Sequence, residues 1–462
     1  MKRKTAVEKL SIVCVCILGF FFISIMVRFL TRQIFVEKLH WNNTFTHFIF
    51  FDNAVMNVEY DAAGEQQTIV AIDWEERYPF KHNKQIQPVE KSFEVQWIEK
   101  YKESVESIKM KAEDYAEDFL IGRIKMVNAA RSYNRLIGSP AMAVNTVDEV
   151  IYLDNGYLTY AESLVEEEQI GEIADRLSSL HDGLEEKDVP FVYMNVGSKV
   201  CPYDRKLPKG AEEYTNENGD HLIAALEERD VETLDFREYM MSDGLDWYSS
   251  YYITDHHWKT KTGLWAAGIV AEYLNQNCGF EFDKKYFEEN AYDIKVVQDY
   301  FLGGQGRVIT FEGVEAEPYE CILPKFDTLF SVKIPSRGLE TMGTYRETLF
   351  DEETFGKIAD YTEEEFLSKP DAYNAVTIRN DALAQIRNHN PENNQGKKIL
   401  VLQDSFGWYS TTFLACDVEK IDIIYPMAFN GSVQSYVEET KPDAVVMMMC
   451  ERNIPTIDFR TD

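Results

Sequence analysis

Strands that alternate with helices near the C-terminus constrain the fold of this chain more than any other feature of its sequence. Three continuous apolar runs stand at Lys398–Gln403, Ile421–Tyr425 and Ala444–Met449, and segments with helical spacing separate them. A strand that is apolar on both faces needs cover on both faces, which is typical of a parallel sheet between two layers of helices. The sequence therefore predicts an α/β fold.

The same alternation begins earlier and sets the limits of the predicted domain. Asn155–Gly156, between two apolar segments, predicts the turn of a β-hairpin. From about residue 279 to 397 the pattern is lost in a stretch rich in acids, glycine and aromatic residues. We therefore expect an α/β domain over residues 145–462 with an insertion at about 279–397. Its other expected elements are the helices Ile170–Leu184, Leu222–Glu228, Gly263–Leu274, Tyr409–Ala415 and Ser432–Glu439 and the strands Pro190–Val196 and Val231–Phe236.

The N-terminus predicts a membrane anchor. Basic residues precede an uncharged run from Leu10 to Val27, which reaches the lower end of the roughly 17–25 residues that span a bilayer. No small-residue cleavage site follows, and the basic bias places the N-terminus in the cytoplasm. We predict a cytoplasmic tail at 1–9, an uncleaved transmembrane signal anchor at 10–30 and an extracytoplasmic remainder, which makes a single-pass protein of the cell membrane. A cleaved signal peptide is the alternative.

Residues 31–144 form the predicted membrane-proximal region. Apolar residues recur at spacings of three and four from Val89 to Met126, which predicts a long amphipathic helix. A coiled-coil stalk and a helix packed on the flank of the domain both need such a stripe. Both interpretations stay open.

The charge of the chain excludes one class of partner. With 79 acidic and 47 basic residues the net charge is −32, whereas affinity for nucleic acids comes mostly from Lys and Arg. We therefore expect no nucleic-acid partner and interpret the charge as a self-repelling, soluble surface in preference to a site for a cationic partner. Of the 7 cysteines, Cys14 and Cys16 lie in the predicted anchor, and the others show no spacing that indicates a disulfide framework.

Candidate chemistry begins in the stretch Tyr252–Thr262, where Asp255, His256, His257 and Trp258 are consecutive. Only 8 histidines occur in the chain, so two adjacent ones are a strong signal. In an extended segment, residues two apart share a face. Asp255 would then orient the imidazole of His257, and His256 would point the other way. A metal site is the alternative, but no third spaced His or Cys is evident, so we predict none.

A nucleophile follows the strand Lys398–Gln403. Ser405 stands at a tight strand-to-helix turn, where its hydroxyl is exposed and the helix N-terminus favours developing negative charge. In parallel sheets the chemistry lies beyond the carboxyl ends of the strands. The serine could instead merely cap the helix. Other strands bring candidate oxyanion or substrate-binding groups to the same edge: Asn195, Lys199, Asn430 and Arg452, of which the two cations could also be ordinary surface charges.

Three motifs give the chain a family resemblance. They are Asp-His-His-Trp at Asp255–Trp258, Leu-Gly-Gly-Gln-Gly-Arg at Leu302–Arg307, and Val-Leu-Gln-Asp-Ser-Phe-Gly at Val401–Gly407. In this order they resemble the DHHW family, which is similar to the alginate O-acetylation proteins and more distantly to SGNH hydrolases. The resemblance implies an SGNH-hydrolase-like α/β domain with Ser405 as nucleophile, His257 as base and Asp255 as its partner.

The resemblance also implies a function. An extracytoplasmic O-acetyltransferase would move an acetyl group through an acyl-serine to a cell-surface or secreted polysaccharide, without a cofactor. A multi-pass membrane acyltransferase is the expected source of the acetyl group. We expect Gly303, Gly304 and Arg307 to help bind the oxyanion or substrate, and Trp258 to serve either packing or sugar stacking. A carbohydrate esterase with the same triad and a non-catalytic polysaccharide-binding protein remain the alternatives.

Overall fold

The structure is a computed structural model, which describes residues 58–60, 66–68, 141–144, 149–309, 314–351 and 372–461. The chain divides into two units, Met1–Met126 and Val127–Asp462. In the first unit the described residues form an antiparallel pair of strands, β1 (Val58–Tyr60) and β2 (Gln66–Thr68). The predicted anchor and long amphipathic helix lie outside the described residues. No helix within the described part is both long and apolar enough to cross a membrane.

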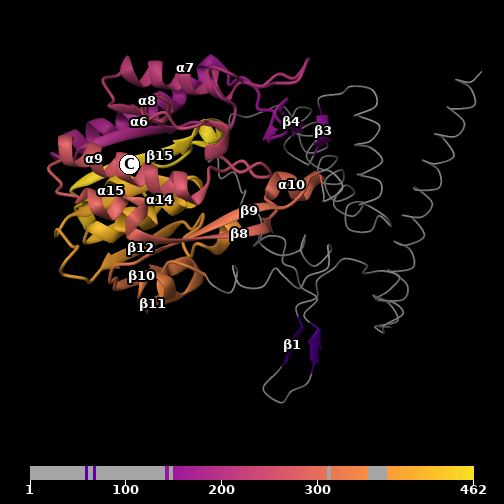
Figure 1. Cartoon of the computed structure of the whole chain (residues 1–462). Helices are drawn as coiled ribbons and strands as arrows, with labels where there is room; N and C mark the ends of the chain where they lie inside the picture. The colour runs from indigo at the N-terminus through magenta and orange to yellow at the C-terminus, as the bar shows by residue number, and fades with distance from the viewer. Residues whose placement is uncertain are drawn as a thin grey trace, which may run out of the picture. The chain divides into compact units, whose positions relative to one another are not determined.

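An eight-stranded sheet organises the second unit (Figure 1). Five of its strands are parallel and stand side by side in the order β14-β13-β15-β6-β7. Strands β6 and β15 are buried at every position, as expected of continuous apolar runs covered on both faces. The bounds are β6 Phe191–Val196, β7 Thr233–Asp235, β13 Lys398–Gln403, β14 Lys420–Ile424 and β15 Ala444–Cys450.

Three further strands extend this sheet in the antiparallel sense, so the prediction of a parallel sheet is wrong on this side. Strand β12 (Leu383–Asn388) pairs with β14, β10 (Phe330–Ile334) pairs with β12, and β11 (Leu339–Gly343) forms the edge. Buried and more exposed positions alternate along β10 and β12. That period of two is typical of antiparallel strands with one solvated face. The sheet is therefore mixed, and the inserted part contributes three strands to it.

Helices cover both faces of the parallel half, as predicted. Along β13, Leu400 and Leu402 belong to one apolar cluster while Ile399 and Val401 belong to the other, because successive side chains of a strand point to opposite faces. The first cluster contains α6 (Glu167–Glu185), α7 (Thr215–Glu227) and α15 (Val433–Thr440), and the second contains α8 (Phe236–Ser242), α9 (Thr260–Asn277) and α14 (Gly407–Leu414).

The close contact between α9 and α14 brings two distant parts of the chain together. A Cβ placed on Gly263 of α9 would lie 3.1 Å from Cβ of Tyr409 in α14, so glycine lets the two helices approach. The histidine stretch leads into α9, and the serine turn leads into α14. Across the same junction, the indole N–H of Trp258 donates a hydrogen bond to the Phe406 carbonyl at 2.9 Å. Helix packing thus explains why motifs far apart in the sequence become neighbours.

Two small antiparallel sheets flank this junction (Figure 1). One contains β3 (Ala141–Val144), β4 (Glu149–Tyr152) and β5 (Leu158–Tyr160); its predicted Asn-Gly turn is present, with Gly156 at φ +86°. The other pairs β8 (Tyr292–Phe301) with β9 (Glu317–Pro324), and α10 (Gly304–Ile309) follows β8. Both contact the histidine stretch: the N–H of Leu158 in β5 donates to the Ile253 carbonyl at 2.9 Å, and Glu317 of β9 accepts the N–H of Thr254 at 2.7 Å.

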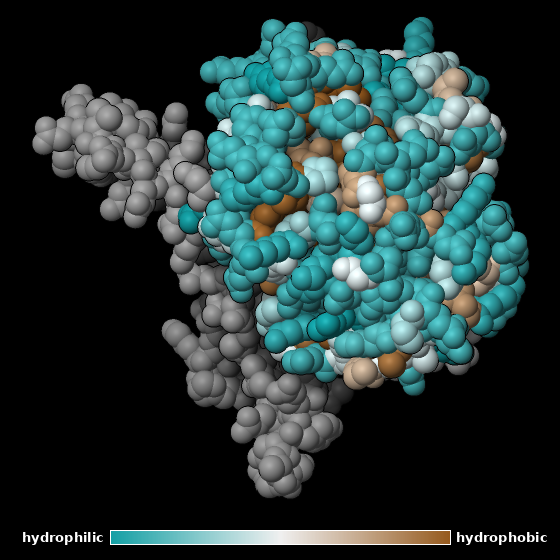
Figure 2. Space-filling view, turned by 90° about the vertical axis from the view of Figure 1, so that its left-hand side faces the viewer, coloured by the Kyte–Doolittle hydropathy of each residue, from teal (hydrophilic) through white to brown (hydrophobic). Residues whose placement is uncertain are grey.

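The surface agrees with the acidic composition. The face drawn in Figure 2 is mostly hydrophilic, and hydrophobic side chains are visible chiefly within hollows between hydrophilic ones. Such a distribution fits a strongly charged chain that keeps its apolar residues in the two clusters beneath the helices.

Candidate active site

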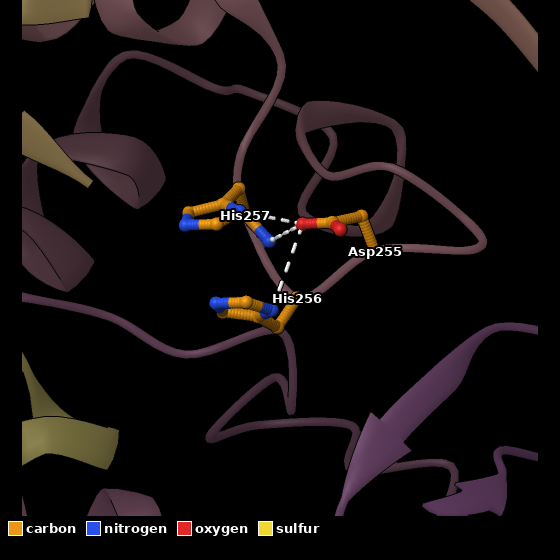
Figure 3. Close-up of side chains that lie close together, drawn as sticks. All are labelled: Asp255, His256 and His257. Atoms are coloured by element: carbon orange, nitrogen blue, oxygen red, sulfur yellow. Dashed lines mark hydrogen bonds and ion pairs between the residues drawn. The ribbon is translucent and has the colours of Figure 1, made fainter. Parts of the chain in front are cut away.

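The histidine loop, Thr254–Trp258, is folded back on its aspartate. Asp255 Oδ1 accepts a hydrogen bond from the backbone N–H of His257 at 2.9 Å and lies 2.5 Å from its ring Nδ1. The bond to a backbone N–H two residues on is an Asx turn, which bends the chain. In Figure 3 the rings of His256 and His257 lie one above the other, beside Asp255.

The predicted alternation of this stretch is therefore wrong for His256. The Asx turn replaces the extended geometry, so His256 does not point away from His257. The two ring centroids are 3.8 Å apart, and His256 Nδ1 lies 3.6 Å from Asp255 Oδ1. Both imidazoles consequently lie against one carboxylate.

The serine turn, Asp404–Gly407, has a related construction at the carboxyl end of β13. Asp404 Oδ1 accepts the backbone N–H of Phe406 at 2.9 Å. Its Oδ2 accepts the backbone N–H of Cys450 at 2.7 Å and the side-chain amide of Asn453 at 2.8 Å. The turn that carries Ser405 is thus attached to the end of the neighbouring strand β15.

The two loops meet as the sequence predicts. Ser405 Oγ lies 2.7 Å from His257 Nε2, while His257 Nδ1 faces Asp255 at 2.5 Å. The three groups form a continuous hydrogen-bonded chain from carboxylate to hydroxyl, the arrangement of a nucleophilic triad. They open onto a pocket of about 360 Å³. Besides the triad, its lining consists of His256, Gly304, Tyr373, Asn374, Asn380, Asp404, Trp408, Tyr425, Arg452 and Asn453.

Aromatic packing fixes the plane of the His257 ring. The ring stacks on Tyr373, with centroids 3.9 Å apart and an interplanar angle of 11°, and the His256 ring covers it at 3.8 Å. The Tyr373 hydroxyl donates to the Ser405 carbonyl at 3.1 Å. One tyrosine therefore holds both the base and the turn of the nucleophile.

The electrostatics favour an ionised Asp255 and a neutral His256. Burial alone would raise the pKa of Asp255, but the adjacent imidazoles of His257 and His256 hold it well below its usual range. Burial, reinforced by His257, lowers the pKa of the His256 imidazole well below its usual value. At neutral pH the site thus contains a carboxylate positioned to orient His257 Nδ1–H.

The glycine loop after β8 supports the aspartate, which differs from the predicted oxyanion role of Gly303 and Gly304. The Gly304 N–H donates to Asp255 Oδ2 at 2.6 Å, and the Gly303 N–H donates to Thr254 Oγ1 at 2.9 Å. A Cβ on Gly303 would lie 2.2 Å from Asp255 Cβ, so only glycine fits there. Glu317 of β9 also accepts two N–H groups, from Ile253 and Thr254.

Two other predicted substrate-binding residues are buried beneath the site. Lys199 is 2% exposed, and its ammonium donates to the carbonyl of Leu158 and the side-chain oxygen of Gln305. Burial lowers its pKa to about 7. Asn195 is fully buried and donates to Asp235 and Glu451, both at 3.2 Å. These contacts give both residues a supporting position rather than a place on the pocket wall.

Of the remaining predicted residues, one lines the pocket and three do not. Arg452 lines the pocket as expected. Trp258 is 1% exposed and packs edge-on against Phe406, so its position is one of packing rather than sugar stacking. Arg307 donates to the carbonyl of Leu302 and does not line the pocket. Asn430 is exposed and also lies outside the pocket lining, because Pro426–Ala428 forms a 3-10 turn after β14 and leaves Tyr425 at the pocket.

Several lining residues have no counterpart in the sequence prediction. Tyr373, Asn374 and Asn380 come from the irregular inserted part, where no periodicity identifies a position. Trp408 lies in α14, one residue before the predicted helix Tyr409–Ala415 begins, and its spacing to the serine would have been a usable signal.

The histidine loop also satisfies a loose definition of a metal site. Ligand atoms of Asp255, His256 and His257 lie within 4.8 Å of one another. However, Asp255 Oδ1 and His257 Nδ1 face each other directly at 2.5 Å, as hydrogen-bonded partners, and the other ring nitrogen faces Ser405. This donor set fits a proton-transfer pair better than tetrahedral coordination with metal–ligand distances of about 2.0–2.2 Å.

The Ser-His-Asp constellation thus lies at the carboxyl edge of a mixed central sheet covered by helices, which is an SGNH-like α/β fold. Residues 149–299 match the family model described as "SGNH hydrolase-like domain, acetyltransferase AlgX". This match confirms the resemblance that the motifs indicate. The comparison with curated proteins finds no match.

The chain is also similar to several solved structures. PatB1 of Bacillus cereus, solved with a sulfonyl adduct, aligns with a TM-score of 0.54 at 18% identity, covering 67% of this chain and 98% of that one. A DHHW family protein from Eubacterium siraeum aligns at 0.49 and 15% identity over 69% of this chain and 98% of that one. The O-acetyltransferase domain of Pseudomonas putida AlgJ aligns at 0.40 and 14% identity over 67% and 94%.

Proposed function

We propose that this protein is an O-acetyltransferase that moves an acetyl group to a polysaccharide hydroxyl through an acyl-serine on Ser405. The observation that carries the proposal is the unbroken chain from Asp255 through His257 to Ser405, with distances of 2.5 and 2.7 Å, at an open pocket. The family model that matches part of the chain describes an acetyltransferase, which supports the choice of group.

In the first half of the reaction, His257 Nε2 takes the proton of Ser405 as its oxygen attacks the acetyl carbonyl of the donor. Asp255 keeps the other ring nitrogen protonated and stabilises the imidazolium that forms. His257 then gives its proton to the leaving group of the donor. Such proton transfer is worth about 10²–10⁴ in rate.

The developing oxyanion needs hydrogen-bond donors near Ser405. No described residue accepts a hydrogen bond from the Ser405 backbone N–H, which therefore remains available to the oxyanion. Asn453 lines the pocket and is held by its bond to Asp404. We assign these two groups to the oxyanion, each worth about 10²–10³ in rate.

The direct test is loss of the nucleophile. In the full-length protein, Ser405→Ala should lower turnover of p-nitrophenyl acetate by at least about 10³-fold, because the acyl-serine cannot form. A sulfonyl fluoride should add its sulfonyl group to wild type and not to Ser405→Ala, measured by intact mass. Ser249→Ala removes an exposed hydroxyl elsewhere and serves as the matched control. Unchanged turnover in Ser405→Ala, with the fold intact by circular dichroism, would contradict the proposal.

An acceptor assay separates the alternatives. With an acetyl ester and a glycan together, a transferase yields acetylated glycan, whereas an esterase yields only acetate. A non-catalytic polysaccharide-binding protein yields neither product while still retaining the glycan.

We also propose that residues 10–30 anchor the protein in the membrane with the catalytic domain outside, where a multi-pass acyltransferase would supply acetyl groups. The uncharged run at Leu10–Val27 and the basic residues before it support this proposal. Cells expressing the full chain should keep it in the membrane fraction after a carbonate wash, with residues 145–462 digested by external protease. Release into the soluble fraction would contradict it.

A further inference from the structure

The charges around the pocket argue against an anionic acceptor. The described lining contains the carboxylates of Asp255 and Asp404 but one fixed cation, Arg452. Arg452 Nε donates to Glu162 at 2.6 Å, and its guanidinium lies 4.1 Å from the centre of the Tyr160 ring. Its charge is therefore already compensated within the protein. A carboxylate on the acceptor would enter a pocket whose fixed charges are mainly negative.

Two nearby cationic side chains also direct their hydrogen bonds to groups of the protein itself. Lys199 is buried, and its ammonium donates to three protein oxygens. Arg379 donates to the Asn374 carbonyl at 2.7 Å and to Asp351 at 3.3 Å. Neither supplies a counter-charge to the pocket, and the net charge of −32 adds a repulsive field for a polyanion.

Uncharged amides occupy the positions where binding cations would be needed. Asn374, Asn380 and Asn453 all line the pocket. Asn380 is exposed, and its side-chain oxygen accepts the indole N–H of Trp408 at 3.1 Å. That bond fixes the orientation of the amide and leaves its NH₂ group for a ligand. A neutral donor of this kind suits a sugar hydroxyl or ring oxygen.

Building on the acetyl transfer proposed above, we propose that the acceptor is an uncharged sugar residue and that Asn380, held by Trp408, binds it. In the transfer step the acceptor oxygen attacks the carbonyl carbon of acetyl-Ser405 and loses its proton to His257 Nε2. The bond between that carbon and Ser405 Oγ breaks, and His257 returns the proton to the serine. The products are the acetylated sugar and free Ser405.

The test compares acceptors that differ in charge. Full-length protein receives p-nitrophenyl acetate with oligomers of glucose, galactose or N-acetylglucosamine, or with oligogalacturonate and its methyl ester. The last two carry the same free hydroxyls. We expect the best acceptor to be uncharged, and the methyl ester to exceed the free acid by about tenfold in kcat/KM at low salt. A charged oligomer as the best acceptor, or a free acid as good as its ester, overturns the inference.

A matched pair of variants tests Asn380 itself. Asn380→Lys adds a cation at the pocket and should reduce the preference for the ester over the free acid by at least about threefold. Asn430→Lys makes the same change at an exposed position outside the pocket and should leave the preference unchanged. Equal shifts in both variants would overturn the role of Asn380. Acetate release without transfer to any acceptor would instead contradict the proposed transferase.

Discussion

The histidine loop and the serine turn use one backbone device for two purposes. In each, an aspartate oxygen accepts the backbone N–H two residues on: Asp255 from His257, and Asp404 from Phe406, both at 2.9 Å. The second oxygen of each is held by a further backbone N–H, from Gly304 and Cys450 respectively. The two carboxylates are almost equally buried, with exposures of 2% and 1%.

Their surroundings separate their roles. Asp255 faces two imidazoles, which lower its pKa well below the usual range despite burial. Asp404 is bonded by neutral donors, and burial raises its pKa. Identical turns therefore do not give identical chemistry, because the neighbouring charges decide whether a carboxylate serves a proton transfer or holds neutral hydrogen-bond donors in place.

Of the substitutions in the two turns, Asp255→Asn should lower activity most strongly. The amide keeps the shape of the turn but no longer selects the right tautomer of His257 or stabilises the imidazolium, so kcat should fall by about 10⁴-fold. Steady-state acetyl-ester turnover measures the loss. A fall of less than about tenfold would show that His257 works without its carboxylate.

Gly303→Ala should give the next largest effect. Its Cβ would lie 2.2 Å from Asp255 Cβ, and both are backbone-fixed, so the aspartate must move. A displacement of about 1 Å at such a site costs about 10²-fold in activity. Gly171→Ala is the control, because nothing lies within 4 Å of its added Cβ. If both variants keep wild-type turnover, the glycine loop does not position the acid.

Asp404→Asn should have the smallest effect on catalysis. The amide NH₂ leaves a buried donor of the turn unpaired, which costs about 1–3 kcal/mol in the free energy of unfolding, while kcat falls by only about tenfold. Denaturant unfolding and acetyl-ester turnover measure the two quantities. A loss of activity as large as that of Asp255→Asn would remove the distinction between the two turns.

The pH dependence of these two variants sharpens the comparison. A carboxyl whose pKa is lowered in the folded state stabilises the fold at pH values above its ordinary pKa of 3.8. That stability is lost as the pH falls through the folded-state pKa. A raised pKa contributes stability that is lost as the pH rises through it. The destabilisation by Asp255→Asn should therefore grow with pH, and that by Asp404→Asn should shrink. The same sign in both would contradict the assigned pKa directions.

The sequence predicts the parallel half of the fold well because each element there repeats a simple pattern. The predicted strand Lys398–Gln403 matches β13 residue for residue, and the predicted Asn-Gly turn is present. Ser405 and His257 were predicted to meet because the carboxyl ends of parallel strands share an edge. One geometric rule was therefore enough to bring two distant motifs together.

The rest depends on contacts that no local pattern encodes. The orientation of His256 follows from an Asx turn, which competes with the extended geometry that its neighbours suggest. Asn380 reaches the pocket from an irregular segment because Trp408 binds it. Asn430 follows a strand that ends at the same edge of the sheet as the site, but a 3-10 turn lies between them and Asn430 is not part of the pocket lining.

The supports of the acid have a consequence for attempts to build a smaller version of this protein. Gly304 and Glu317, which hold the histidine loop, both lie in the stretch that interrupts the regular strand–helix alternation. The serine turn, by contrast, keeps its bonds through Asp404 to Cys450 and Asn453 outside that stretch and loses with it the hydrogen bond from Tyr373. A shortened protein that keeps only the regular strands and helices would retain the position of the Ser405 hydroxyl. It would lose the position of the His257 imidazole, which accepts the serine proton. Shortening this protein without losing its chemistry therefore requires grafting the glycine loop and β9 along with the core.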